Sequence, residues 1–205
     1  MERFYLEEPT INRKKEAIEY IEEHNKYNSD TNGTGSMDRY IENYSYEEWL
    51  EELEKRKDDN YLKEINRCHS KTFFLIREND NKLIGMINIR YQLTEEDLLK
   101  GATHIGYGIR PTERRKGYNK INLYLGLLEM QKLNEENILM DCTTKNIGFN
   151  KTILSLGGTL IKTEIDPLDN EETNYYNIDV NKSIETYSDY YEQFISTNNT
   201  SKKGK

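Results

Sequence analysis

The chain has 205 residues, with 37 acidic and 29 basic side chains, so its formal net charge is −8 and its pI is about 5.1. This balance argues against nonspecific binding to nucleic acid or to an anionic membrane surface, because both partners require a broad basic face. Hydrophobic residues make up 35% of the chain, and no apolar run is long enough to span a bilayer. The length suits one domain, or one domain with an added lobe.

The cysteines and histidines indicate neither a disulfide framework nor a metal site. Cys68 and Cys142 are the two cysteines and lie far apart, which fits a reducing compartment. His24, His69 and His104 show no metal-ligand spacing with them or with each other. The first residues lack the apolar core of a signal peptide, so we expect a cytoplasmic protein without a bound metal.

The N-terminal third is predicted to be mostly helical. A short strand over 4–6 precedes a helix over 13–27, where apolar residues recur at helical spacing. A Ser-x-x-Glu capping box starts a second helix over 46–58. Residues 28–38 between the helices are rich in Gly, Asn, Ser and Thr, and predict a loop.

Three strands are predicted in the middle of the chain. Residues 72–77 and 83–90 flank a polar turn and read as a hairpin. After a polar link, residues 103–110 form a third strand, which contains Gly106 and Gly108. This glycine pair indicates either a bulge or a place where a ligand approaches the backbone.

The C-terminal half alternates helices and strands. A long helix over about 115–133 is apolar nearly all round and is expected to pack against a sheet. It leads to a strand over 137–142, which predicts a parallel pair with the strand before the helix. Asn146 then starts a short helix, and residues 159–165 and 174–180 form a closing hairpin around a loop at 166–170. The element order predicts an α/β (mixed α+β) fold.

The segment 109–120, between the third of these strands and the long helix, carries a net charge of +4. Cations at a helix N-terminus are unfavourable by about 0.3–1 kcal/mol each, so the cluster suggests an absent anion. Backbone N–H groups and basic side chains together suit a phosphate or pyrophosphate, and Gly117 would let the backbone approach it. The alternative is a solvated basic turn. The charged residues are Arg110, Arg114, Arg115, Lys116 and Lys120 against Glu113.

This segment resembles a known motif. Pro111-x-x-Arg114-x-x-Gly117-x-Asn119 is similar to the acyl-CoA signature of the GNAT superfamily of acetyltransferases, whose core reads Arg/Gln-x-x-Gly-x-Gly/Ala. Residues 104–109 are similar to the strand before that signature. The last motif position, usually Gly or Ala, is Asn119 here.

The resemblance covers residues 71–181 and implies a fold and a domain plan. The fold would be a central, mixed but mostly antiparallel twisted sheet flanked by helices, with the acyl-CoA site in the loop between the fourth strand and the third helix. Residues 1–181 would form one acetyltransferase domain, with the acceptor side in 1–70 and the acyl-CoA core in 71–181. Residues 182–205 are polar and are predicted to be a disordered tail.

The resemblance also implies a function. It predicts an N-acetyltransferase that moves an acetyl group from acetyl-CoA to a primary amine of a small molecule or peptide by direct attack. The alternative is a weak or silent module that only binds or senses acyl-CoA. Residues 28–38 would then be a lid over the acceptor or an ordinary surface loop. The oligomeric state stays open, with a homodimer as one arrangement.

Site residues follow from the motif and from strand geometry. The backbone at Ile109 would polarise the thioester carbonyl, as in the family. His104 is the first candidate for general base because its ordinary pKa suits that task, Tyr107 is the second, and a proton relay through solvent is the third. The predicted cofactor-binding residues are Ile109, Arg110, Arg114, Arg115, Lys116, Gly117, Tyr118, Asn119 and Asn146.

Two further positions depart from the family pattern. Counting from Asn146, the position that often carries a proton-donating Tyr is Ile153, and a position that is usually small is Phe149. Protonation of the departing thiolate would then come from water or from another Tyr. A cysteine acyl-enzyme formed by Cys142 with His104 is a less favoured mechanism.

Overall fold

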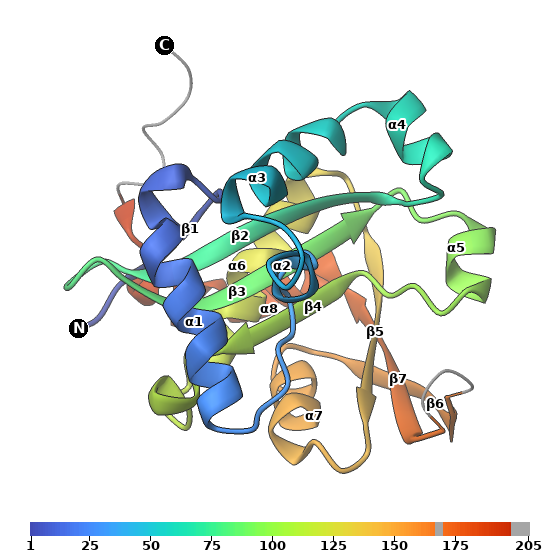
Figure 1. The fold of residues 1–205 in the computed structure, drawn as a ribbon. Helices are drawn as coiled ribbons and strands as arrows, with labels where there is room; N and C mark the ends of the chain where they lie inside the picture. The colour runs from blue at the N-terminus through green and yellow to red at the C-terminus, as the bar shows by residue number, and fades with distance from the viewer. Residues whose placement is uncertain (167–169, 198–205) are drawn as a thin grey trace.

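The computed structural model describes residues 1–166 and 170–197 and shows a mixed α+β fold. Two antiparallel sheets form its centre, and helices flank them (Figure 1). The first sheet has the order β1-β2-β3-β4 and is antiparallel throughout. Its strands are β1 (Phe4–Glu7), β2 (His69–Arg77), β3 (Lys82–Tyr91) and β4 (Ile105–Ile109).

The second sheet has the order β5-β7-β6. Its strands are β5 (Asn137–Thr143), β7 (Glu172–Asp179) and β6 (Thr159–Ile165). The expected parallel pair is therefore not a regular ladder, because β4 is an edge strand that pairs only with β3. The two sheets meet at one place, where the N–H of His104 donates to the carbonyl of Leu139 at 2.9 Å. Beyond this contact β4 and β5 diverge, which leaves one edge of β4 open. The loop predicted at 166–170 lies largely outside the described residues.

The N-terminal helices cover one face of the first sheet (Figure 1). Apolar side chains of α1, α2 and α3 pack against β2 and β3 around Trp49, which is fully buried. The predicted capping box of α3 is present, since Ser45 and Glu48 exchange hydrogen bonds. Asn12 does not cap α1, because residue 12 lies inside the short helix η1. The helices are η1 (Ile11–Arg13), α1 (Lys14–Lys26), α2 (Met37–Tyr40), α3 (Tyr46–Lys55) and α4 (Asp59–Glu64).

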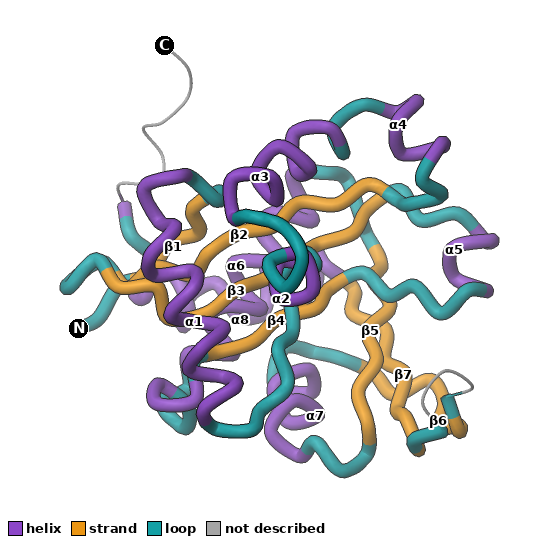
Figure 2. The backbone as a smooth tube through the Cα atoms, in the orientation of Figure 1, coloured by secondary structure: helices purple, strands orange, loops and turns teal. Residues whose placement is uncertain are grey.

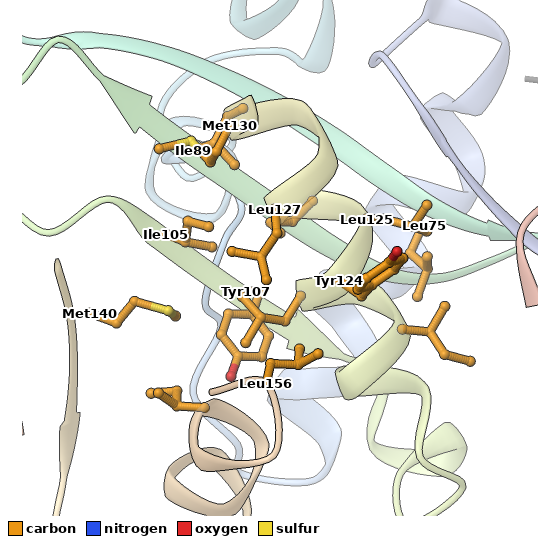
Figure 3. Close-up of a cluster of buried hydrophobic side chains, with 14 of the residues drawn as sticks. Leu75, Ile89, Ile105, Tyr107, Tyr124, Leu125, Leu127, Met130, Met140 and Leu156 are labelled. Atoms are coloured by element: carbon orange, nitrogen blue, oxygen red, sulfur yellow. The ribbon is translucent and has the colours of Figure 1, made fainter. Parts of the chain in front are cut away.

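The opposite face of the sheet is covered by α6 (Tyr118–Lys132), the long apolar helix. Its Leu123, Leu125 and Leu127 are buried against β3 and β4 in the larger core cluster (Figure 3). A helix that is apolar nearly all round is stable only when it is buried in this way. The remaining helices are α5 (Glu95–Leu99), η2 (Pro111–Glu113), α7 (Ile147–Leu154), α8 (Val180–Tyr191) and η3 (Glu192–Phe194). None of the helices in the described ranges is long and apolar enough to cross a membrane.

The prediction of a disordered tail from residue 182 is wrong for the part of the tail that is described. Residues 180–191 form α8, capped by Asp179, whose carboxylate accepts from the N–H of Lys182. Val180, Ser183 and Tyr191 are buried, and Tyr191 stacks on Tyr124 of α6 at 4.8 Å. Few apolar residues mark α8 in the sequence, so its packing against α6 provides most of its stability. Residues 198–205 lie outside the described part.

The segment between α1 and α2 crosses over β4 on the sheet face opposite α6 (Figure 2). We name residues 28–36 the crossing segment. A Cβ built at Gly33 would lie 2.5 Å from the carbonyl oxygen of Gly106, and one built at Gly108 would lie 3.1 Å from the carbonyl oxygen of Asn32. The glycine pair of β4 therefore accommodates this segment of the same chain.

We expect Gly33→Ala to lower the free energy of unfolding by about 2 kcal/mol or more. Gly33 has φ +73°, and the added methyl group would collide with backbone atoms of β4. Gly148→Ala is the control, because a Cβ there has only the Asn146 side-chain oxygen within reach, at 4.0 Å, and a helical Ala is favourable. Urea titration of both variants tests this expectation, and equal stabilities would show that the close packing is absent.

Candidate functional site

A cavity of about 430 Å³ lies between β4, the N-terminus of α6 and α7. We name it the β4–α7 cavity. Tyr107, Gly108 and Ile109 line it from β4, and Phe149 and Thr152 line it from α7. The volume is within the range of small-molecule sites, and apolar walls with a few polar groups are typical of them.

Most of the predicted cofactor residues reach this cavity. His104, Arg110 and Lys116 are not part of its lining. Of the two candidate catalytic residues, the structure brings only Tyr107 to it. The predicted residues that line the cavity are Tyr107, Ile109, Arg114, Arg115, Gly117, Tyr118, Asn119 and Asn146.

One end of the cavity has the properties of an anion site. Gly117 is the N-cap residue of α6 with φ +84°, and a Cβ built on it would meet nothing within 4 Å. Within the described part of the chain, the N–H groups of residues 117–119 donate to no hydrogen-bond acceptor. Such a helix end binds phosphate groups through these N–H groups and its positive dipole. Free N–H groups and open space at Gly117 are the features that a bound phosphate or pyrophosphate requires.

The cations of the basic segment divide into two groups. Arg110 is buried and forms an ion pair with Glu23 at 2.9 Å, and Lys116 forms one with Glu113 at 2.8 Å. These two are therefore neutralised within the protein, so only part of the positive charge of this segment is available to a bound anion. Arg114, Arg115 and Lys120 have no carboxylate partner among the described residues, and all three line the cavity.

Arg110 holds α1 on the sheet. Its Nε donates to the carbonyl of Leu83 at 2.7 Å and its Nη2 to the carbonyl of Glu16 at 2.9 Å. With the Glu23 ion pair, each of the three guanidinium nitrogens donates a hydrogen bond to a protein group. A buried guanidinium needs such partners, so Arg110 is not free to contact a cofactor.

Glu113 balances the charge behind the loop. Burial alone would raise the pKa of this carboxyl, but hydrogen bonds from Lys116, Lys82 and Arg77 outweigh that effect and lower the pKa to about 2. Glu113 is therefore ionised at neutral pH. It removes part of the positive charge that the sequence places near Gly117 and fixes the turn before α6.

Asn119 contributes a polar atom at the position where the motif usually has Gly or Ala. Its Oδ1 is buried without a hydrogen-bond partner among the described residues, and Asn119 lines the cavity. A buried acceptor without a partner is costly, and a bound N–H or O–H group would satisfy it. The Asn119 side chain therefore does not fill the cavity, and it adds a hydrogen-bond acceptor to the cavity wall.

His104 joins the two sheets instead of facing the cavity. Its backbone N–H donates to the Leu139 carbonyl, and its Nδ1 lies 3.0 Å from the Leu139 backbone nitrogen and 3.3 Å from the Leu139 carbonyl oxygen. The neutral tautomer with its proton on Nε2 lets Nδ1 accept from the Leu139 N–H. Burial lowers the pKa of His104, although Glu135 and the Leu139 backbone act in the opposite direction.

We expect His104→Ala to lower the free energy of unfolding by about 1–3 kcal/mol, because the Leu139 N–H loses its acceptor. The lowered pKa also makes stability depend on pH. The unfolded chain binds more protons below its ordinary pKa of about 6.5, so stability falls as pH drops through that value. Denaturant titrations from pH 5 to 8 should show that the free energy of unfolding falls less with decreasing pH in His104→Ala than in the unaltered protein. A steeper dependence in the variant would contradict this assignment.

Tyr107 lines the β4–α7 cavity, and its hydroxyl is buried. The side chain is fully buried and points from β4 toward α7 (Figure 3), where its ring stacks on Phe149 at 4.0 Å. Its hydroxyl makes no hydrogen bond of full geometry among the described residues. Burial, with a contribution from Cys142, raises the pKa of Tyr107 well above its ordinary value and outweighs the Thr152 side chain, which is close enough to lower that pKa. The phenol is therefore protonated at neutral pH and cannot accept a proton as a base.

The α7 positions that depart from the family pattern have structural explanations. Asn146 caps α7, with its side-chain oxygen accepting from the Phe149 N–H at 3.2 Å. Phe149 supplies the stacking partner for Tyr107, and Ile153 is fully buried in the core. The phenol that this helix lacks is thus present at the cavity on β4.

Burial raises the pKa of Cys142 to about 12, and Asp141 adds to the effect. Its thiol is therefore protonated and is a poor nucleophile. His104 is bound to Leu139 and does not activate it. These facts remove the support for the cysteine acyl-enzyme. No group of three or more potential metal ligands occurs in the described ranges.

The crossing segment supplies residues that sequence reasoning assigned only loosely. Ser29, Asp30 and Asn32 line the β4–α7 cavity, and Nη2 of Arg114 donates to the Ser29 hydroxyl at 2.7 Å. The signal in the sequence was the run of Gly, Asn, Ser and Thr residues. That run indicated a loop or a lid, and the fold places it over β4.

A family model described as "Acetyltransferase (GNAT) family" matches residues 37–149. This range includes β4, the basic segment and the start of α7. Comparison by sequence with curated proteins finds no match.

Solved structures of similar fold are acetyltransferases at low sequence identity. The microcin C7 self-immunity acetyltransferase MccE, in complex with acetyl-CoA and AMP, is 16% identical, with a TM-score of 0.59 over 86% of this chain and 92% of that one. A ribosomal-protein-S5-alanine acetyltransferase from Vibrio fischeri is 14% identical, with 0.64 over 87% and 93%. A spermidine N-acetyltransferase SpeG chimera from Vibrio cholerae and hSSAT is 13% identical, with a TM-score of 0.61 over 89% of this chain and 98% of that one.

Proposed function

The chain belongs to the acetyltransferase (GNAT) family, and from that premise we propose that it transfers an acetyl group from acetyl-CoA to a primary amine. The observation that carries the proposal is the free N-terminus of α6 at Gly117, which opens into the β4–α7 cavity beside three unpaired cations. The diphosphate of coenzyme A would bind there. Arg114, Arg115 and Lys120 would balance its charge, and Asn119 and Asn146 would contact the cofactor from the cavity wall.

The open edge of β4 would hold the thioester. The N–H of Arg110 donates across to Ile84 of β3, so the N–H of Ile109 points to the opposite edge, which no strand covers. An N–H at this place would donate to the acetyl carbonyl and stabilise the negative charge that develops on its oxygen. This is the role expected for the Ile109 backbone.

The reaction needs three proton movements. The acceptor ammonium loses a proton, and we assign this step to solvent because His104 does not line the cavity. The amine nitrogen then attacks the carbonyl carbon and a C–N bond forms, and the nitrogen gives up a second proton to solvent as the C–S bond breaks. The departing thiolate takes up a proton. We assign its donor as Tyr107, which lines the cavity, and the phenolate that forms recovers its proton from solvent.

A module that binds acyl-CoA without turnover is the second candidate. The observation that favours it is the crossing segment, because Asn32 and Gly33 pack closely over Gly106 and Gly108 of β4. An acceptor that approached over this face would have to displace them. In that case acetyl-CoA would bind but no amine would be acetylated.

Isothermal titration with acetyl-CoA, followed by a free-thiol assay with a panel of amines, tests the proposal. We expect binding and amine-dependent release of coenzyme A. Binding with no turnover across the panel would favour the module, and the absence of binding would contradict both. The proteins of similar fold include a ribosomal-protein-S5-alanine acetyltransferase and a spermidine N-acetyltransferase. The panel should therefore include peptides, polyamines and amino acids.

A further inference from the structure

A second cavity of about 360 Å³ lies on the other side of the crossing segment. We name it the arginine cavity because four arginines line it. They come from four different parts of the N-terminal half, namely α2, the C-cap of α3, the loop before β2, and β3. They are Arg39, Arg56, Arg67 and Arg90.

Three of the four arginines are not neutralised by the protein. Arg39, Arg67 and Arg90 form no ion pair within the described ranges, whereas Arg56 has a carboxylate partner, Glu52 at 2.9 Å. The one acidic residue in the lining is Asp38, which accepts hydrogen bonds from two threonine hydroxyls. With the ion pair of Arg56 and Glu52 counted as neutral, the lining carries a net charge of +2 in a chain whose net charge is −8.

Two of the guanidinium groups are held in place. Nη1 of Arg90 donates to the Thr103 carbonyl at 2.6 Å. Arg56 is fixed by Glu52 and donates to the Gly35 carbonyl at 3.4 Å. Arg39 and Arg67 are exposed at the mouth of the cavity and can adapt. Fixed guanidinium groups with unused N–H donors match the geometry of carboxylate and phosphate oxygens.

The arginine cavity lies next to the proposed reaction site. Gly106 lines the arginine cavity and Gly108 lines the β4–α7 cavity, while Asn32 lines both. Two residues along a strand span about 6.6 Å, a distance that suits a small molecule with an amine and an anionic group. Asn32 and Gly33 of the crossing segment pack over both glycines, so such a molecule bridges the two cavities when this segment shifts. The amine would then reach the open edge of β4 near Ile109.

We propose that the acceptor of the acetyl group is an amine that also carries an oxyanion, and that the arginine cavity binds this oxyanion. This inference rests on the proposed acetyl transfer and specifies its substrate class. A carboxylate and a phosphate share the required chemistry, since both offer oxygens to several guanidinium N–H groups. A polyamine would instead be repelled by the net positive lining.

The test uses pairs of amines that differ only in the oxyanion, with coenzyme A already bound. Aspartate and asparagine form the carboxylate pair, phosphoethanolamine and ethanolamine form the phosphate pair, and spermidine is the cationic member. We expect the anionic member of at least one pair to bind about 10-fold more tightly by calorimetry, and to be acetylated faster with acetyl-CoA. The pair in which the anionic member binds more tightly shows whether the oxyanion is a carboxylate or a phosphate.

The double variant Arg39→Gln, Arg67→Gln should reduce that preference about 10-fold while leaving the affinity for coenzyme A unchanged. Both residues are exposed, so the fold should persist. Arg3→Gln is the matched control, because Arg3 is exposed and lines neither cavity. Equal binding within both pairs, or tighter binding of spermidine, would overturn the inference while the acetyl-CoA proposal stands. If the unaltered protein does not bind coenzyme A, the acetyl-CoA proposal itself is contradicted.

Discussion

Replacing Gly117 with Asp should weaken acetyl-CoA binding about 30-fold, which corresponds to about 2 kcal/mol. The new carboxylate would stand at the N-cap of α6, where the N–H groups of residues 117–119 have no acceptor in the described chain. It would accept from these N–H groups and repel the diphosphate. A Cβ at Gly117 meets no protein atom within 4 Å, but any side chain there is strained at φ +84°, so the effect of charge is measured against an uncharged side chain of the same shape.

Gly117→Asn is the matched control for this change. Asn has the same shape as Asp without the charge, and it tolerates the positive φ of +84° better than most residues. We expect it to alter the affinity only a few-fold. Calorimetric titration of both variants, with thermal unfolding to confirm the fold, separates charge from shape. Unchanged affinity in Gly117→Asp would remove this loop from the cofactor site.

Replacing Tyr107 with Phe should lower kcat about 100-fold with little change in affinity for acetyl-CoA. The hydroxyl has no partner in the described chain, so its removal costs little in the ground state but takes away the proton donor for the thiolate. Stability should stay the same or rise, because a buried hydroxyl without a partner is unfavourable. The pKa of Tyr107 is raised well above 10, so the pH–rate profile should fall uniformly without a shift.

Tyr124→Phe is the control for the loss of a buried phenol. Tyr124 is 1% exposed and stacks on Tyr191 of α8, away from the β4–α7 cavity. We expect its kcat to match that of the unaltered protein. Stopped assays of thiol release with saturating acetyl-CoA measure both variants. Full activity in Tyr107→Phe would show that solvent, and not Tyr107, donates the proton to the thiolate.

Local sequence alone determined the positions of most helices and strands and the cofactor loop. Apolar periodicity located α6, the Ser-x-x-Glu pattern located the start of α3, and the spacing of Arg114 and Gly117 identified the acyl-CoA motif. These features depend on residues within about one helical turn or one strand of each other, so they can be read without the fold.

Only the tertiary structure decided which charges and polar groups are free. Arg110 is neutralised by Glu23, 87 positions earlier, and His104 is bound to Leu139 in another sheet. Gly106 and Gly108 face the crossing segment, and the four arginines of the second cavity come together from separate elements. Such contacts join distant parts of the chain, and the physical reason they escape sequence reading is that burial and charge pairing arise from packing, which local patterns do not specify.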